Sequence, residues 1–133
     1  MRFLPSRGDV GFYYATADAY VGPSIEDTFA QPPAEAMSCG LPVITTVTNG
    51  TAEIMTDGED GILLRDPFDA RALAAAMRSL AGDRELCRQL GENAARTARE
   101  YTWDRNGQQF REIFARILSR KEKSSAAAIH QES

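Results

Sequence analysis

Hydrophobic runs alternate with amphipathic stretches through the first half of the chain, a pattern typical of an α/β fold. Strands are predicted where apolar or β-branched residues run together, at residues 19–21, 42–46 and 61–64, with a possible stub at 2–4. Helical patterns fall between them at residues 10–17 and 31–39, with a single helical turn at 52–55. Strands that alternate with helices pair in parallel, so the sequence predicts an open parallel sheet flanked by helices.

The second half of the chain is predicted to be helical. Asp66 is expected to cap a helix that starts at Pro67. Its buried stripe is expected to be Phe68, Leu73, Met77 and Leu80. Asp83 is expected to cap a second helix, with a stripe of Leu86, Leu90, Ala94 and Ala98. Thr102 can cap a third, whose inward-facing residues would be Trp103, Phe110, Ile113, Phe114 and Ile117. The apolar face ends after Ser119, so we expect a domain over residues 1–121 and a flexible tail over 122–133.

Composition narrows the classes of function. The 133 residues are 43% hydrophobic and 26% charged, as in ordinary globular domains. A net charge of −4 argues against a nucleic-acid partner or an anionic membrane surface. No apolar run approaches the ~20 residues of a membrane span, and no signal-peptide pattern opens the chain. The two cysteines, Cys39 and Cys87, have no metal-binding spacing, so we expect a reduced, cytoplasmic protein.

The candidate chemistry lies in residues 23–37. Asp27 and Glu35 are two carboxylates with seven residues between them, the first expected in a loop and the second in the opening turn of a short helix. Pro32 and Pro33 suit a helix start, where missing amide protons cost little. The positive end of a helix favours anions, so the combination suits a ligand with both hydroxyls and phosphates. A plainer interpretation, in which the two carboxylates are solvated charges or helix caps, stays open.

Several other sites are excluded by the sequence. It contains neither the Gly-x-Gly-x-x-Gly pattern of a standard dinucleotide site nor a Walker A loop. The only histidine, His130, lies in a polar tail, so no Ser-His-Asp or Cys-His arrangement can be built from it.

Residues 17–64 resemble a known family. The matching pieces are Ala-Asp-Ala-Tyr-Val-Gly-Pro-Ser at 17–24, Asp-Thr-Phe at 27–29, Glu-Ala-Met-Ser-Cys-Gly-Leu-Pro-Val-Ile at 35–44, Asn-Gly-Thr-Ala-Glu-Ile-Met at 49–55 and Asp-Gly-Glu-Asp-Gly at 57–61. Together they are similar to the C-terminal, donor-binding domain of retaining GT-B glycosyltransferases of family 4, the glycosyl transferases group 1. The resemblance implies a partial Rossmann-like domain, with a parallel sheet flanked by helices and a helical C-terminal part.

The resemblance also implies roles for single residues. Glu35 matches the second glutamate of the family's E-x7-E pattern, which binds the ribose hydroxyls of the nucleotide-sugar donor. Asp27 matches the first, which approaches the transferred sugar, and is the candidate catalytic residue. Thr28, Phe29 and Ala30 complete the implied donor site. Two departures are Asp27 in place of glutamate and Ala30 in place of glycine. The implied partner is a UDP-, GDP- or ADP-sugar, with no metal or other cofactor.

The resemblance further implies that the chain is a fragment. Family members have an N-terminal domain and a basic residue pair for the donor phosphates, and neither matches anything in this sequence. The expected function is therefore the donor-binding portion of a hexosyltransferase, inactive alone. The apolar face around Phe110 and Phe114 is expected to be partly uncovered and to allow self-association. Two alternatives stay open: an epimerase or sugar phosphorylase of the same fold, and a non-catalytic remnant or interaction module.

Overall fold

The computed structural model describes residue 4 and residues 8–131, with side chains described as far as residue 121. Most of the predicted strand stub at residues 2–4 lies outside the described residues. The chain divides into two compact units, residues 1–99 and residues 100–133. The predicted boundary between residues 121 and 122 stays a prediction.

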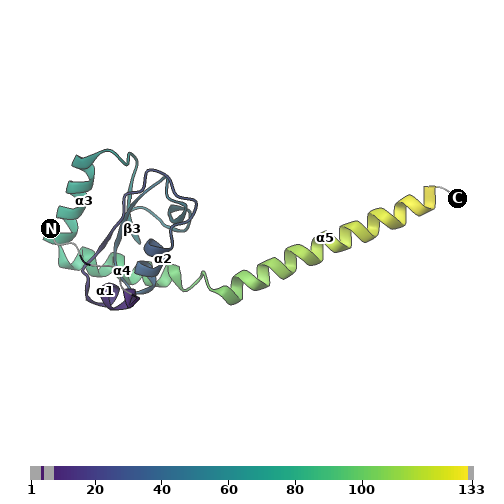
Figure 1. Ribbon diagram of the computed structural model, residues 1–133, viewed down its shortest axis with the longest axis horizontal. Helices are drawn as coiled ribbons and strands as arrows, with labels where there is room; N and C mark the ends of the chain where they lie inside the picture. The colour runs from purple at the N-terminus through teal and green to yellow at the C-terminus, as the bar shows by residue number, and fades with distance from the viewer. Residues whose placement is uncertain (1–3, 5–7, 132–133) are drawn as a thin grey trace. The chain divides into compact units, whose positions relative to one another are not determined.

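A three-stranded parallel sheet forms the centre of the first unit (Figure 1). The strands are β1 (Tyr20–Val21), β2 (Val43–Thr46) and β3 (Gly61–Leu64), in the spatial order β1-β2-β3. In the register, Tyr20 lies opposite Val43, and Val43 lies opposite Gly61. The predicted parallel sheet and its three strands are confirmed.

Helices connect and cover the strands in the predicted order. They are α1 (Val10–Thr16), α2 (Gln31–Ser38), the 3₁₀ helix η1 (Gly50–Ile54), α3 (Ala70–Gly82) and α4 (Arg84–Ala98). Each parallel crossover contains a helical segment, because a tight hairpin cannot join parallel strands. The mixed α/β fold class predicted from the sequence is therefore confirmed.

The hydrophobic core lies on both faces of the sheet, because successive strand residues point to opposite sides. Val43 faces a cluster with Ala36 and Met37 of α2. Its neighbour Ile44 faces a second cluster, which includes Ala76 and Leu80 of α3. Figure 1 shows α2 and α3 on opposite sides of the strands. Helix α4 joins the two layers, since it contributes Ala94 to the first cluster and Leu90 to the second.

The predicted start of α3 is wrong. The helix begins at Ala70, not at Pro67, and its cap is Asp69, whose Oδ1 accepts the N–H groups of Arg71 and Ala72 at 2.9 Å each. Asp66 instead closes a turn by accepting the Phe68 N–H at 2.8 Å. Phe68 therefore precedes the helix and is 73% exposed, where burial was expected.

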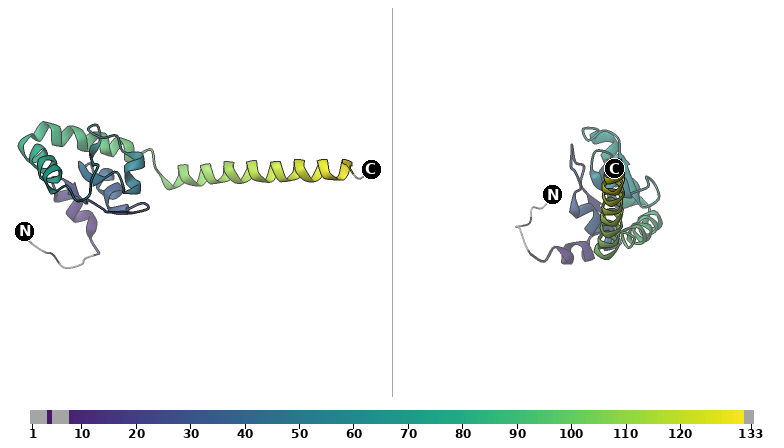
Figure 2. Two further views of the ribbon diagram at one scale, coloured as in Figure 1. Left: turned by 90° about the horizontal axis from the view of Figure 1, so that it is seen from above. Right: turned by 90° about the vertical axis from the view of Figure 1, so that its right-hand side faces the viewer.

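The rest of the predicted α3 stripe is partly confirmed. Leu80 is buried and Leu73 packs against the same cluster, but Met77 is 48% exposed. Asp83 caps α4 as predicted, by accepting the Leu86 N–H at 2.9 Å. The left view of Figure 2 shows the change of direction between the end of α3 and the start of α4.

The second unit contains α5 (Trp103–Gln131). Its predicted cap is confirmed, since Thr102 Oγ1 accepts the Arg105 N–H at 3.3 Å. Its apolar side chains were expected to face inward, and this is wrong, whereas the expected exposure around Phe110 and Phe114 is confirmed. The side chains are exposed because their own unit offers nothing to pack against. They include Trp103, Phe110, Ile113, Phe114 and Ile117. Among the described residues, no helix is long and apolar enough to cross a membrane.

Candidate functional site

The predicted site residues gather at the carboxyl ends of β1 and β2. Loop 24–30 follows β1, and segment 46–51 runs on from the end of β2. Ligands of open α/β sheets bind outside the carboxyl ends of the strands. The position of Asp27, Thr28, Phe29 and Ala30 in this loop therefore fits a ligand site.

Loop 24–30 is tied at its start to segment 46–51. The Ser24 carbonyl accepts hydrogen bonds from the hydroxyls of Thr46, at 2.5 Å, and Thr48, at 3.0 Å. The Ser24 hydroxyl accepts a third from Asn49 Nδ2 at 3.0 Å. Since Thr46 and Asn49 are almost fully buried, little competing water reaches these bonds. They hold the entry to the loop in one place.

The middle and end of the loop are tied to the same segment. The Asp27 N–H donates to the Thr48 carbonyl at 3.3 Å, and the Gly50 N–H donates to the Asp27 carbonyl at 2.8 Å. The buried Thr51 hydroxyl donates to the Ala30 carbonyl at 2.7 Å. Asp27 therefore sits on a backbone that is fixed on both sides.

Gly50 allows this close approach. A Cβ atom at this position would lie 1.7 Å from the Thr28 carbonyl oxygen and 2.5 Å from its carbon. Real Cβ atoms do not approach backbone atoms so closely. The absence of a side chain at Gly50 is therefore required for loop 24–30 to pair with segment 46–51.

The Asp27 carboxylate is exposed at the surface of the loop. Its Oδ1 accepts the Phe29 N–H at 3.1 Å, which closes a local turn. A carboxylate has about four lone-pair positions, so this bond leaves others for a ligand. The side chains of Thr28 and Phe29 are exposed beside it.

Ala30 has an ordinary backbone conformation, with φ −67° and ψ 124°. Any residue adopts such angles, so alanine in place of the family's glycine adds no backbone strain. The remaining effect of the departure is the methyl group itself.

Glu35 lies in the second turn of α2, where the opening turn was expected. The helix starts at Gln31, and its first turn contains no acidic residue. Pro32 and Pro33 also supply no N–H groups, which leaves the start of α2 fewer donors for an anion than a normal helix start. The helix dipole is present, but the expected ring of free N–H groups is reduced.

The Glu35 carboxylate has a partner that the sequence did not indicate. The Tyr14 hydroxyl of α1 donates to Glu35 Oε2 at 3.1 Å. Burial and this hydrogen bond raise the pKa of Tyr14 to about 12. Burial, followed by the negative charges of Asp27 and Glu35, also raises the pKa of Tyr20. Both predicted carboxylates, Asp27 in loop 24–30 and Glu35 in α2, therefore act electrostatically on the Tyr20 phenol.

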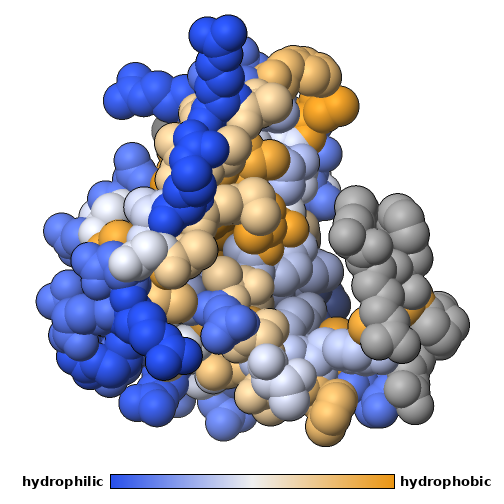
Figure 3. Space-filling model, turned by 90° about the vertical axis from the view of Figure 1, so that its left-hand side faces the viewer, coloured by the Kyte–Doolittle hydropathy of each residue, from blue (hydrophilic) through white to orange (hydrophobic). Residues whose placement is uncertain are grey.

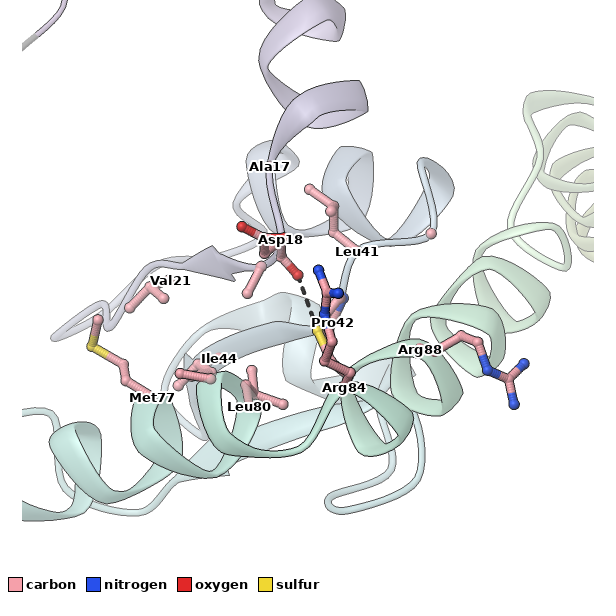
Figure 4. A pocket seen from close by; sticks show the side chains of 14 residues that line it. Ala17, Asp18, Val21, Leu41, Pro42, Ile44, Met77, Leu80, Arg84 and Arg88 are labelled. Atoms are coloured by element: carbon pink, nitrogen blue, oxygen red, sulfur yellow. Dashed lines mark hydrogen bonds between the residues drawn. The ribbon is translucent and has the colours of Figure 1, made fainter.

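A hollow of about 600 Å³ lies away from these carboxylates, at the amino ends of β1 and β2 (Figure 4). Its floor is apolar, with Val21, Ile44 and Leu80, while Asp18 and Arg84 lie at its rim. On the side of the molecule drawn in Figure 3, hydrophobic surface likewise forms a strip between hydrophilic margins. Among the described residues, no group of three or more His, Cys, Asp or Glu side chains could hold a metal ion.

Sequence reasoning missed the residues that support the site. Tyr14 lies outside the matched motif, and nothing in its local pattern indicates a bond to Glu35. Asn49 and Thr51 did carry a signal, because both lie in the matching piece at residues 49–55, but no supporting role was predicted for them.

Comparison with known proteins agrees with this geometry. The family model described as glycosyl transferases group 1 matches residues 1–97. The chain is 37% identical over 109 residues to a D-inositol 3-phosphate glycosyltransferase of Geodermatophilus obscurus, covering 79% of this chain and 23% of that protein. The chain thus spans about a quarter of the length of such relatives.

Solved structures are also similar. The sucrose-phosphate synthase of Thermosynechococcus elongatus superposes with a TM-score of 0.71 at 33% identity, covering 80% of this chain and 28% of that one. Anabaena HepE in complex with UDP and glucose superposes with a TM-score of 0.78 at 26% identity, covering 86% and 31%. The matched family model, these relatives and the GT-B fold agree, and the chain belongs to the glycosyl transferases group 1 family.

Proposed function

We propose that this chain is the donor-binding part of a retaining glycosyltransferase, which transfers a hexose from a nucleotide-diphosphate sugar to an acceptor. The observation that carries the proposal is that two exposed carboxylates, on neighbouring segments, both act on one phenol. Asp27 lies on a loop fixed by hydrogen bonds, Glu35 lies on α2, and both lie near the Tyr20 phenol. Hydroxyl-rich ligands are bound by carboxylates held in this way.

Each carboxylate has a proposed role. Glu35 accepts hydrogen bonds from the ribose hydroxyls of the nucleotide, and Asp27 accepts them from the sugar that is transferred. Thr28, Phe29 and Ala30 line the path between the two. The dipole of α2 lies near the diphosphate and stabilises the charge that develops on it as it leaves. Asp27 is the candidate catalytic residue because it is nearest the transferred sugar.

Uridine diphosphate is the first probe, because Anabaena HepE was crystallised with UDP and with UDP-glucose. We expect UDP added to the ¹⁵N-labelled 133-residue chain to shift NMR signals of loop 24–30 and α2. GDP and ADP in parallel titrations identify the preferred base. No shift with any of the three at millimolar concentration would contradict donor binding by this chain.

Substitution of the two carboxylates sharpens the test. Glu35→Ala should weaken nucleotide binding about tenfold or more, because charge-assisted hydrogen bonds contribute roughly 1.5–3 kcal/mol each. Asp27→Ala should affect discrimination between UDP-glucose and UDP more than affinity for UDP. Glu26→Ala is the matched control, since Glu26 is an exposed carboxylate next to Asp27. If Glu26→Ala weakens binding and Glu35→Ala does not, the assignment of Glu35 is wrong.

The 133-residue chain should bind donor without transferring sugar. Multiple turnovers with any UDP-, GDP- or ADP-sugar would contradict this part of the proposal. A cytoplasmic location is also proposed, because Cys39 and Cys87 are free thiols and a reducing compartment keeps thiols in this state.

Self-association through α5 is a further part of the proposal. Phe110 and Phe114 stack with ring centroids 6.3 Å apart and are more than half exposed. Exposed apolar patches of this kind drive association. Sedimentation should show dimers or larger species that Phe110→Ser with Phe114→Ser removes, while Gln108→Ser, on the same helix, leaves them unchanged. A monomeric chain at high concentration would contradict self-association.

A further inference from the structure

Tyr14 lies outside the matched motif but contacts its central carboxylate. It sits on α1, 21 residues before Glu35, and its hydroxyl donates to Glu35 Oε2 at 3.1 Å. Among residues whose side chains the structure describes, no other side chain bonds this carboxylate. The contact therefore joins two helices that flank the same face of the sheet.

The Tyr14 ring is itself held in place. It packs against the core cluster that contains Ala36 and Met37, the two residues directly after Glu35 in α2. Packing of the half-buried ring on this cluster restricts its movement, and therefore restricts where its hydroxyl lies. A phenol has few rotatable bonds, so little entropy is lost when it orients a neighbour.

Glu35 needs such a partner. Its side chain is exposed, and a free glutamate loses up to about 2 kcal/mol of rotamer entropy when it is ordered. To accept two neighbouring hydroxyls, both carboxylate oxygens must point in a defined direction. A hydrogen bond to Oε2 orders the side chain before any ligand arrives, and the remaining lone pairs stay available.

We propose that Tyr14 is a positioning residue, which orients the Glu35 carboxylate for the vicinal hydroxyls of the nucleotide ribose. This inference rests on the proposed function, because it concerns the same donor site. It adds a residue of α1 to a site otherwise built from loop 24–30 and α2. Its effect should be specific to ligands that carry the two ribose hydroxyls.

The first experiment measures nucleotide binding to the 133-residue chain by NMR titration. Tyr14→Phe keeps the ring and removes the hydroxyl, and should weaken UDP binding about three- to tenfold. It should leave binding of 2′,3′-dideoxyuridine diphosphate unchanged, since that ligand lacks the hydroxyls. Tyr13→Phe is the control, because Tyr13 is a half-buried tyrosine on the same helix with no bond to Glu35. Equal losses for both ligands, or tighter UDP binding, would overturn the inference.

The second experiment needs no ligand. Ring-¹³C-labelled tyrosines are titrated by NMR in the wild-type chain and in Glu35→Gln. Burial, the bond to Glu35 and the charges of Glu35, Tyr20 and Cys39 raise the pKa of Tyr14. Removing the Glu35 charge should lower the Tyr14 pKa from about 12 toward its ordinary value of 10.0, although burial keeps part of the shift. An unchanged Tyr14 titration would overturn the inference.

The two experiments separate the possible failures. If UDP does not bind but Glu35→Gln lowers the Tyr14 pKa, the proposed function is wrong. The contact between Tyr14 and Glu35 is then real, but a role in orienting Glu35 for a nucleotide is wrong. If UDP binds with Glu35-dependent affinity and Tyr14→Phe has no effect, the proposed function stands and the role of Tyr14 is wrong.

Discussion

The two ends of the sheet are built in different ways. At the carboxyl end, loop 24–30 is held by hydrogen bonds from the buried side chains of Thr46, Asn49 and Thr51. At the amino end, an open hollow of about 600 Å³ has an apolar floor. One thiol there donates to the backbone, from Cys87 to the Asp18 carbonyl at 3.2 Å (Figure 4).

The difference shows at which end of the sheet the backbone is held in a single arrangement. Buried polar groups must be fully paired, so a network of them permits few alternative arrangements of the backbone. Apolar contacts are less directional and tolerate small shifts. The end with directional bonds presents Asp27, whereas among the described residues that line the hollow Asp18 is the one carboxylate.

The largest difference in stability between the two ends is expected from replacing one glycine by alanine at each end. Gly50→Ala places a Cβ atom 1.7 Å from the Thr28 carbonyl oxygen, so loop 24–30 has to separate from segment 46–51. We expect a loss of stability of about 3 kcal/mol and loss of UDP binding. Gly82→Ala, at the end of α3, meets no atom within 4 Å and should be neutral or slightly stabilising. Thermal unfolding of both variants measures the difference; equal melting temperatures would contradict the contrast.

A smaller effect is expected from the polar network itself. Asn49→Ala removes the donor to Ser24 Oγ and the acceptor of the Thr51 N–H, from a side chain that is 1% exposed. The cost should be about 1–3 kcal/mol, because buried partners are left unpaired. Asn93→Ala is the control: Asn93 is half-buried, and its Nδ2 donates to the carbonyl of the exposed Glu59 at 2.7 Å, in a bond that solvent can reach. Urea unfolding should show a clearly smaller loss for Asn93→Ala.

The strands and the carboxylate loop could be predicted from the sequence because their signals are local. The run Val43-Ile44-Thr45-Thr46 is apolar and β-branched, and such runs indicate a buried strand wherever they occur. Asp27 and Glu35 could be named as candidates because their spacing lies within one continuous stretch.

Other features could not be predicted because several local solutions compete or because the contact is distant. Asp66 and Asp69 are both acceptable caps, and only the bonds that Asp69 makes to Arg71 and Ala72 decide where α3 starts. The hydroxyl of Tyr14 reaches Glu35 across 21 residues, and no periodicity contains that contact. The start of α2 at Gln31 was predicted, but Glu35 is its fifth residue and therefore lies one turn later than the expected opening turn.

A third prediction uses pH to weaken the site without mutation. The pKa of Tyr14 is raised to about 12 in the folded chain, against an ordinary value of 10.0. The stability it contributes is complete below pH 10 and is lost as the pH rises toward 12, because the unfolded chain gives up its proton first. Urea unfolding at pH 9, 10 and 11 should show this decline, and Tyr14→Phe should reduce it. Tyr20 keeps part of the slope, since its pKa is also raised. Identical slopes for wild type and Tyr14→Phe would contradict the prediction.

The smallest effect is expected at the amino end, from Cys87→Ser. The Cys87 thiol is a weak donor to the Asp18 carbonyl, and a serine hydroxyl can make the same bond with a side chain of similar size. The hollow beside it also leaves room for a small shift of the backbone. We therefore expect a change in stability within about 0.5 kcal/mol.

Thr46→Val makes a change of similar size at the carboxyl end, but it removes a buried hydroxyl that donates to the Ser24 carbonyl at 2.5 Å. That variant should lose about 1 kcal/mol or more, since the Ser24 carbonyl loses one of its two donors. If Cys87→Ser proves as damaging as Thr46→Val in urea unfolding, the amino end is held as rigidly as the carboxyl end and the contrast between them fails.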